Sequence, residues 1–269
     1  MTQTIALVGF GEAGSTFATA AGWAGCARGW DIDVVRRAAM NACGVVAAGS
    51  AAEALADADL VLSLVTADQA LVAADGNAGA LCPGTIWCDM NSVAPETKRA
   101  AARAVEAAGG HYVDVAVLAP VNPARLNVPL LLAGRAAETA AQALRAAGFT
   151  NTRVVGDEIG RASAIKMIRS VMVKGIEALA AEMMLAAEAA GVADEVLASL
   201  DASEKAMPWR ERADYNIERM VTHGLRRAAE MEESARTLSG LGVEPIMTAG
   251  TVRRQRAQAG NPIERSAKG

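Results

Sequence analysis

A short apolar run that meets a glycine-rich turn at the start of the chain limits the possible folds most. Residues 5–8 read Ile-Ala-Leu-Val, and a G-x-G-x-x-G pattern follows at Gly9, Gly11 and Gly14. Gly9 permits a tight turn, Gly11 lets the backbone approach a pyrophosphate, and Gly14 lets a helix pack closely on the strand. Because the helix then presents free N–H groups to the phosphates, the segment predicts a strand–turn–helix unit that binds a dinucleotide.

Strand and helix patterns alternate after this unit. Further strands are expected within residues 26–35 and at 59–65, 85–89, 112–117 and 128–132, with helices at 14–21 and 94–108. Such alternation is typical of a doubly wound parallel sheet. The chain is 52% hydrophobic but only 3% aromatic, so small aliphatic side chains dominate, which suits strands buried on both faces. Residues 1–160 are therefore expected to form an α/β Rossmann domain that binds NAD(P).

The pattern becomes helical near residue 160. One apolar stripe at steps of three or four indicates a single long helix over about 162–190. The stripe consists of Ile165, Ile168, Met172, Ile176, Leu179 and Met183. Further helices are expected at 193–200, 209–236 and 245–258, so residues 161–269 predict an all-α second domain.

Composition excludes several classes of protein. The net charge is -4, and the sequence holds no dense Lys/Arg block interleaved with aromatic residues, so no nucleic-acid partner is expected. No apolar run reaches the roughly 18 residues of a membrane span. Residues 1–4 lead into the first strand without a basic leader, which favours a cytoplasmic protein. The four cysteines lack metal-ligand spacing and are expected to be buried free thiols, with no metal.

The choice of cofactor depends on the residues after the second strand. An acid about 20 residues after the glycine loop binds the adenosine ribose hydroxyls in this motif, and Asp31 stands at that distance from Gly11. Asp33 is a rival. Arg36 and Arg37 would instead hold a 2′-phosphate and select NADP. The spacing favours NAD and leaves NADP open.

Three runs carry a family resemblance: Val8-Gly-Phe-Gly-Glu-Ala-Gly14, Asp89-Met-Asn-Ser92, and Gly160-Arg-Ala-Ser-Ala-Ile-Lys166. They resemble the glycine loop, the D-x-S-[ST] substrate loop and the lysine-bearing G-x-x-x-x-x-K helix of the β-hydroxyacid dehydrogenase and 6-phosphogluconate dehydrogenase superfamily. His223-Gly-Leu-Arg-Arg227 further resembles a subgroup whose C-terminal domain has no known function. Arg169, Ser170 and Lys174 are typical of the same subgroup.

The resemblance implies a homodimeric dehydrogenase acting on a small 3-hydroxy acid or related alcohol, with Lys166 as general acid/base. The stripe Lys166, Ser170, Lys174 runs at i, i+4, i+8 on the long helix. The expected cofactor residues are Gly9, Phe10, Gly11, Glu12, Ala13, Gly14, Asp31, Val65, Thr66 and Asn91. The expected substrate residues are Asn91, Ser92, Arg169, Ser170, Lys174 and His223.

Other interpretations stay open for these residues. The lysine stripe is also compatible with a solvated helix face, Ser92 with a helix N-cap, and His223 with a packed or surface residue. Arg226 and Arg227 could bind a substrate acid or pair with Glu230.

The chain departs from the family at two places. Residues 114–120 read Asp-Val-Ala-Val-Leu-Ala-Pro where the family has D-A-P-V-S-G-G, and Arg169 and Ser170 replace the two Asn of K-x-x-N-N. These departures argue against 6-phosphogluconate as substrate. An NADPH-dependent imine or ketone reductase and a non-catalytic NAD(P)-binding sensor remain as alternatives.

Overall fold

The computed structural model describes residues 3–203 and 206–262. The chain divides into two compact units, Met1–Ser170 and Val171–Gly269. The division lies inside the long helix α7, Arg161–Ala190. Among the described residues, no helix is long and apolar enough to cross a membrane.

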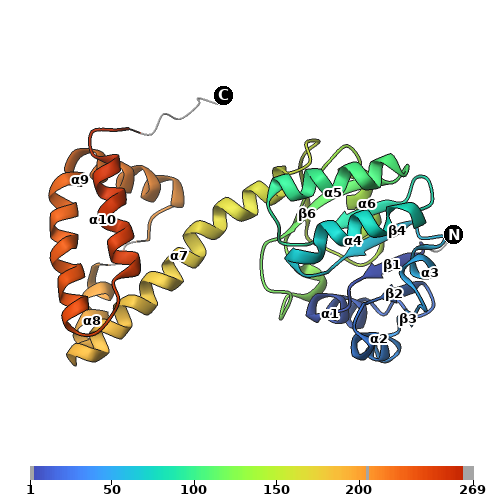
Figure 1. Cartoon of the computed structure of the whole chain (residues 1–269), viewed down its shortest axis with the longest axis horizontal. Helices are drawn as coiled ribbons and strands as arrows, with labels where there is room; N and C mark the ends of the chain where they lie inside the picture. Colours follow the sequence, from blue (N-terminus) through green and yellow to red (C-terminus); the bar gives the residue numbers. More distant parts are fainter. Residues whose placement is uncertain (1–2, 204–205, 263–269) are drawn as a thin grey trace. The chain divides into compact units, whose positions relative to one another are not determined.

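The first unit is built on one sheet with the strand order β3-β2-β1-β4-β5-β6-β7-β8 (Figure 1). Its strands are β1 Ile5–Val8, β2 Ala27–Trp30, β3 Val46–Ala47, β4 Leu60–Ser63, β5 Ile86–Asp89, β6 His111–Val117, β7 Leu130–Ala133 and β8 Thr152–Gly156. Its helices before α7 are α1 Glu12–Ala21, α2 Val34–Met40, α3 Ala51–Leu55, α4 Ala70–Asn77, α5 Pro95–Ala107 and α6 Ala137–Ala146. This confirms the predicted Rossmann-type α/β domain.

One strand pair departs from the expected all-parallel sheet. β6 and β7 run antiparallel, while the other neighbours pair in parallel. A parallel connection needs a crossover of a dozen or more residues, usually a helix. Between β6 and β7 the described chain forms only the 3-10 turn Arg125–Asn127, so it returns without crossing the sheet.

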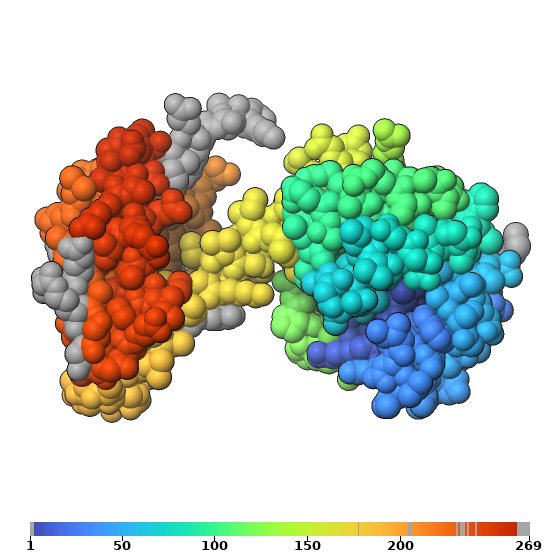
Figure 2. Space-filling model, viewed as in Figure 1, coloured from blue at the N-terminus to red at the C-terminus, as the bar shows by residue number. Residues whose placement is uncertain are grey.

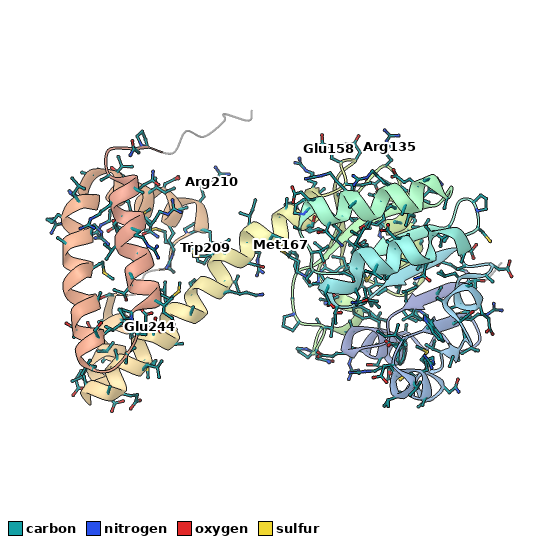
Figure 3. The ribbon with its side chains drawn as sticks, in the orientation of Figure 1. Arg135, Glu158, Met167, Trp209, Arg210 and Glu244 are labelled. Carbon is teal, nitrogen blue, oxygen red and sulfur yellow. The ribbon has the colours of Figure 1, made fainter. Side chains whose placement is uncertain are left out.

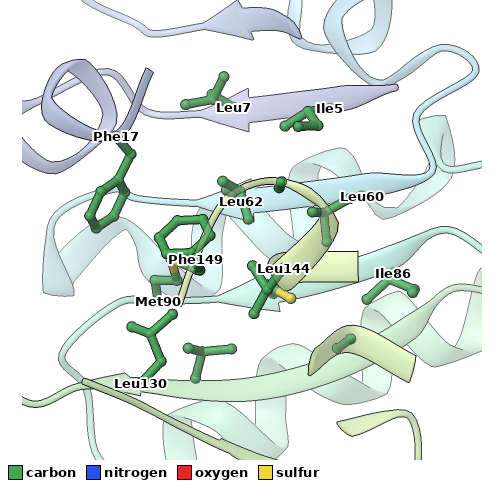
Figure 4. Packing of buried hydrophobic residues seen from close by; sticks show 14 of the residues in the cluster. Ile5, Leu7, Phe17, Leu60, Leu62, Ile86, Met90, Leu130, Leu144 and Phe149 are labelled. Atoms are coloured by element: carbon green, nitrogen blue, oxygen red, sulfur yellow. The ribbon is translucent and has the colours of Figure 1, made fainter. Parts of the chain in front are cut away.

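Alternating side chains bury the sheet on both faces. From β1, Ile5 and Leu7 enter one apolar cluster and Ala6 and Val8 enter the other. The first cluster packs β1, β4, β5 and β7 against α1 and α6, and Figure 4 shows Leu7, Leu62 and Phe149 within it. On the second face, α4 and α5 pack side by side and form much of the surface visible in Figure 2.

The second unit consists of helices in the described residues: the remainder of α7, then α8 Ala193–Ser203, α9 Trp209–Gly240 and α10 Ile246–Gln258. The closest packing joins α9 and α10, which lie side by side (Figure 1). Gly224 makes this possible, because a Cβ there would collide with the carbonyl oxygen of Gln255 on α10. The predicted all-α second part is thereby confirmed.

The cysteines are free, as expected, but they are not all buried. Cys88 is buried, Cys82 is exposed, and Cys26 and Cys43 are half-buried. Burial raises the pKa of the Cys88 thiol well above its usual range, so it stays protonated. Cys82 follows a 3-10 turn near the start of β5, where the chain passes over the surface.

Candidate active site at the carboxyl edge of the sheet

The sheet register brings several strand ends to one level. Val8 pairs with Trp30 and with Ser63, Ser63 pairs with Asp89, and Asp89 pairs with Asp114. The loops that follow β1, β2, β4 and β5 therefore leave the same edge of the sheet. Open α/β sheets bind their ligands at this carboxyl edge.

The glycine loop after β1 leaves its backbone accessible. Gly9 has φ +91°, and a Cβ there would stand 2.6 Å from the Leu64 carbonyl oxygen. A Cβ at Gly14 would lie 3.1 Å from the Gly9 carbonyl oxygen, whereas one at Gly11 would meet nothing within 4 Å. Gly9 and Gly14 thus have packing roles, and the open space at Gly11 suits a bound phosphate group.

A cavity of about 570 Å³ lies beside this loop. Its lining includes seven residues predicted for the cofactor: Gly9, Gly11, Glu12, Ala13, Asp31, Val65 and Thr66. Of the other three, Phe10 is buried, Gly14 packs under the loop, and Asn91 lies in the loop that follows β5, Ile86–Asp89. The volume and the lining fit a dinucleotide at the place that the glycine motif predicts.

Asp31 joins the loops after β1 and β2. Its Oδ2 accepts the Phe10 N–H at 2.6 Å and its Oδ1 accepts the Asp33 N–H at 2.9 Å. Asp33 caps α2 by accepting the Val35 N–H. Of the two arginines, Arg36 lines the cavity, while Arg37 stacks 4.4 Å from the Trp30 ring centre and donates to the Asp31 carbonyl. Asp31, its rival Asp33 and the cationic Arg36 all line the cavity and bear on cofactor choice.

Lys166 meets the loop after β5. Its Nζ donates to Ser92 Oγ at 2.5 Å, and the lysine is half-buried in the first turns of α7. Figure 3 labels Met167, the next residue along α7. Ser92 does not cap α5, because the N-cap residue is Ala94 and makes no side-chain cap hydrogen bond.

Asn91 keeps one polar atom without a partner. Its Nδ2 donates to Ser63 Oγ at 3.0 Å and its backbone N–H donates to Asp89 Oδ1 at 2.9 Å. Its Oδ1 has no hydrogen-bond partner among the described residues although the residue is buried. A buried acceptor of this kind costs free energy unless a ligand or water satisfies it.

A buried charged cluster lies directly below this loop. Lys98 Nζ donates to the Asp89 carbonyl oxygen at 2.6 Å and to Asp89 Oδ1 at 2.9 Å, and lies 3.6 Å from Asp114 Oδ1. The Tyr112 hydroxyl donates to Asp89 Oδ2 at 2.5 Å. Burial and the Asp89 carboxylate raise the pKa of Tyr112 well above its usual range, so the phenol keeps the proton that it donates.

Sequence reasoning missed Lys98, although a signal was present. A charged side chain on a helix normally indicates a solvated face. Yet Lys98 stands three, four and seven residues before Ala101, Ala102 and Val105, which form the buried side of α5. The helical spacing alone therefore assigns Lys98 to the buried face.

The remaining predicted residues are distributed over both units. Arg169 is exposed and its Nη1 lies 3.4 Å from the Leu118 carbonyl oxygen, while Ser170 is half-buried at the end of the first unit. Lys174 and His223 belong to the second unit, so their substrate roles stay predictions. The Glu230 side chain lies outside the described residues. Among the described residues no His/Cys/Asp/Glu cluster could hold a metal ion.

The Rossmann-type sheet and the cavity beside its glycine loop are typical of NAD(P)-binding oxidoreductases. The NAD binding domain of 6-phosphogluconate dehydrogenase matches residues 4–156, more than half of the 269-residue chain. The chain therefore belongs to this oxidoreductase family, which confirms the resemblance and the NAD(P) cofactor. A domain of unknown function (DUF1932) matches residues 187–258 in the second unit.

Three solved structures illustrate the relationship. A conserved hypothetical protein from Sinorhizobium meliloti 1021 is 38% identical, with 96% of this chain and 88% of that chain covered and a TM-score of 0.64. A conserved protein of unknown function, described as structurally similar to 3-hydroxyacid dehydrogenases, is 30% identical over 95% and 96% of the two chains, with a TM-score of 0.61. An imine reductase from Streptomyces aurantiacus has a TM-score of 0.78 at 23% identity, over 97% and 96%, and shows the shared fold.

Proposed function

We propose that the chain transfers a hydride between a nicotinamide cofactor and the hydroxyl carbon of a small 3-hydroxy acid or related alcohol. The observation that carries this proposal is the hydrogen bond between Lys166 Nζ and Ser92 Oγ. It joins a proton-transfer group to a loop that leaves the same sheet edge as the cofactor cavity. A 30% identical protein that is described as structurally similar to 3-hydroxyacid dehydrogenases also supports the proposal.

In this proposal Lys166 moves the proton that accompanies the hydride. A nicotinamide cofactor held beside the glycine loop by the residues that line the cavity would accept the hydride during oxidation and supply it during reduction. During oxidation, neutral Lys166 takes the proton of the substrate hydroxyl, and during reduction the Lys166 ammonium returns it to the forming alkoxide. Ser92 fixes the direction of Nζ, and the unpartnered Asn91 Oδ1 accepts a donor from the bound ligand.

The preferred cofactor in this proposal is NAD. The Asp31 carboxylate lines the cavity at the end of β2, where an acid accepts the adenosine ribose hydroxyls and repels a 2′-phosphate. Arg36 lines the same cavity and supports NADP as the alternative, since a guanidinium binds phosphate strongly.

Reduction of an imine is a second candidate function. It is favoured by the high structural agreement with an imine reductase, at a TM-score of 0.78. Both reactions use a hydride and a proton on the same scaffold. In both reactions the hydride adds to carbon. The proton goes to oxygen in a ketone and to nitrogen in an imine, so the product, an alcohol or an amine, distinguishes the two reactions.

A second copy of the chain is the proposed protein partner. The family resemblance implies a homodimer, and α7 carries large apolar side chains that are exposed in the single chain. They include Ile168, Val171, Met172, Ile176 and Leu179. Pairing with a second copy would remove this apolar stripe from water.

The test is a panel of short 3-hydroxy acids with NAD or NADP, followed by nicotinamide absorbance, with Lys166→Ala as the matched blank. Loss of the general acid/base is expected to lower kcat about 10²- to 10⁴-fold while NADH binding by fluorescence stays within the error of wild type. Equal turnover by wild type and Lys166→Ala would refute the role of Lys166. In a parallel assay of cyclic imines with NADH or NADPH, turnover of the imines and of no 3-hydroxy acid would replace the first candidate with the second.

A further inference from the structure

The buried cluster around Lys98 connects the two segments that meet in the proposed site. On one side, Lys98 holds Asp89, whose Oδ1 accepts the Asn91 N–H and so fixes the loop that carries Ser92. On the other side, the partner carboxylate is Asp114 on β6, at 3.6 Å. Both carboxylates and the lysine are 0–1% exposed.

Asp114 in turn holds the start of α7. Its Oδ2 accepts the Gly160 N–H at 3.1 Å, the Ser163 N–H at 2.9 Å and the Ser163 hydroxyl at 3.1 Å. The two N–H groups are among the donors that a helix N-terminus leaves without intrahelical partners. An acceptor from the sheet therefore fixes the position and axial rotation of the turn that leads to Lys166.

We propose that Lys98 is a positioning residue: through Asp89 and Asp114 it holds the Ser92 loop and the first turn of α7 at the spacing that brings Ser92 Oγ to Lys166 Nζ. This inference rests on the proposed role of Lys166. Lys98 itself touches neither substrate nor cofactor, and acts through the two carboxylates.

The energetics of buried charge favour positioning over simple stabilisation. Desolvation of two carboxylates and one ammonium offsets much of their attraction, so an apolar replacement of similar volume often stabilises a fold equally well. The ammonium donates two hydrogen bonds to Asp89 on β5, and its charge lies 3.6 Å from the Asp114 carboxylate on β6. A side chain without directed donors would fill the space but would not set the relative positions of these segments.

Amide hydrogen exchange tests the link without any substrate. Lys98→Met removes the charge and keeps the length, and Lys98→Met/Asp114→Asn also removes the charge of one of the two carboxylates, so that the cluster keeps its wild-type net charge. Arg103→Met, an exposed site on the same helix, is the matched control. In Lys98→Met and in the double variant, peptides covering 90–93 and 160–166 are expected to exchange roughly ten- to a hundredfold faster. Peptides of β1 and β4 keep the wild-type rate.

A second measurement reads the consequence at Lys166. Mass spectrometry measures how acylation of Lys166 by acetic anhydride depends on pH. We expect this pH profile to shift in Lys98→Met in the same direction as in Ser92→Ala. It should stay unchanged in Arg103→Met. NADH or NADPH binding confirms that each variant is folded. If a cofactor-binding Lys98→Met or double variant keeps wild-type exchange in both segments, the proposal is wrong. Amide exchange and acylation are both measured without turnover. Their results therefore stand even if no 3-hydroxy acid in the panel is a substrate.

Discussion

At the residue scale, Asp31 is the side chain on which the NAD assignment depends. Asp31→Ala is expected to weaken NADH binding at least about tenfold and to change NADPH binding less, because a carboxylate repels a 2′-phosphate. Separate fluorescence titrations with NADH and NADPH measure this. Arg36→Ala is the matched variant and should weaken only NADPH. If wild type prefers NADPH and Asp31→Ala leaves both affinities unchanged, the NAD assignment fails and Arg36 becomes the selecting residue.

Ser92 provides the second test at this scale. Ser92→Ala removes the acceptor of the Lys166 hydrogen bond, and Ser92→Thr retains a hydroxyl. On whichever substrate the panel identifies, the alanine variant is expected to lose about tenfold or more in kcat, with NADH affinity unchanged and activity largely restored in the threonine variant. Full activity of Ser92→Ala would show that Lys166 needs no such partner.

Side chains with a linear sequence context were easier to predict than buried ones. Gly9, Gly11 and Asp31 could be assigned because a fixed spacing relates them to one strand and one helix. Tyr112 and Asp114 gave no such signal, since their partners Asp89 and Ser163 lie 23 and 49 residues away in sequence. Only the sheet register brings these groups together.

At the scale of elements, the contact between α9 and α10 depends on Gly224. A Cβ at this position would meet the Gln255 carbonyl oxygen and the Ala259 Cβ, so Gly224→Ala is expected to destabilise the second unit by about 1–3 kcal/mol. Gly175→Ala on α7 is the control, because a Cβ there meets nothing within 4 Å and alanine favours a helix. Calorimetry should show a lower Tm for the first variant only. Equal Tm values would mean that the helices need no close approach here.

The start of α10 has a pH-dependent cap. Glu182 on α7 accepts the N–H groups of Met247 and Thr248 and the Thr248 hydroxyl. Burial opposes ionisation, but these hydrogen bonds outweigh it and lower the pKa of Glu182. Since the folded pKa is depressed, the stabilisation is present above the ordinary value of 4.5 and is lost as the pH falls through the folded pKa.

Glu182→Gln should therefore reduce stability at neutral pH by about 1–3 kcal/mol, and this difference should shrink as the pH falls from the ordinary value of 4.5 through the lowered pKa. Urea unfolding of both proteins at several pH values measures it. A difference that stays constant into acid would exclude an ionised cap.

Elements were predicted well where periodicity is long and poorly where strands are short. The apolar stripe defined α7 almost to its ends, because thirty residues give many turns of evidence. By contrast, β3 has two residues, and β8 lies at the sheet edge with partly exposed side chains. Their sequences carry little pattern, and pairing with β2 and β7 decides their conformation.

At the scale of the whole molecule, the exposed stripe on α7 predicts association. Sedimentation is expected to give a dimer for wild type, and Val171→Asp, at a residue 76% exposed in the single chain, is expected to give a monomer. Val35→Asp, at a residue 70% exposed on α2, should leave the dimer intact. A monomeric wild type, or a dimer unaffected by Val171→Asp, would remove α7 as the interface.

In the proposed reduction, hydride adds to the carbonyl carbon of a 3-keto acid and Lys166 donates the proton to its oxygen. The direct measurement uses NADH or NADPH deuterated at the transferable position, with a mixture of 3-keto acids and cyclic imines, and mass spectrometry of the products. Wild type is expected to place deuterium on the hydroxyl-bearing carbon of a 3-hydroxy acid, and Lys166→Ala is expected to lose this labelled product although it still binds the cofactor. Deuterium found only in an amine, or labelling that Lys166→Ala leaves unchanged, would contradict the proposal.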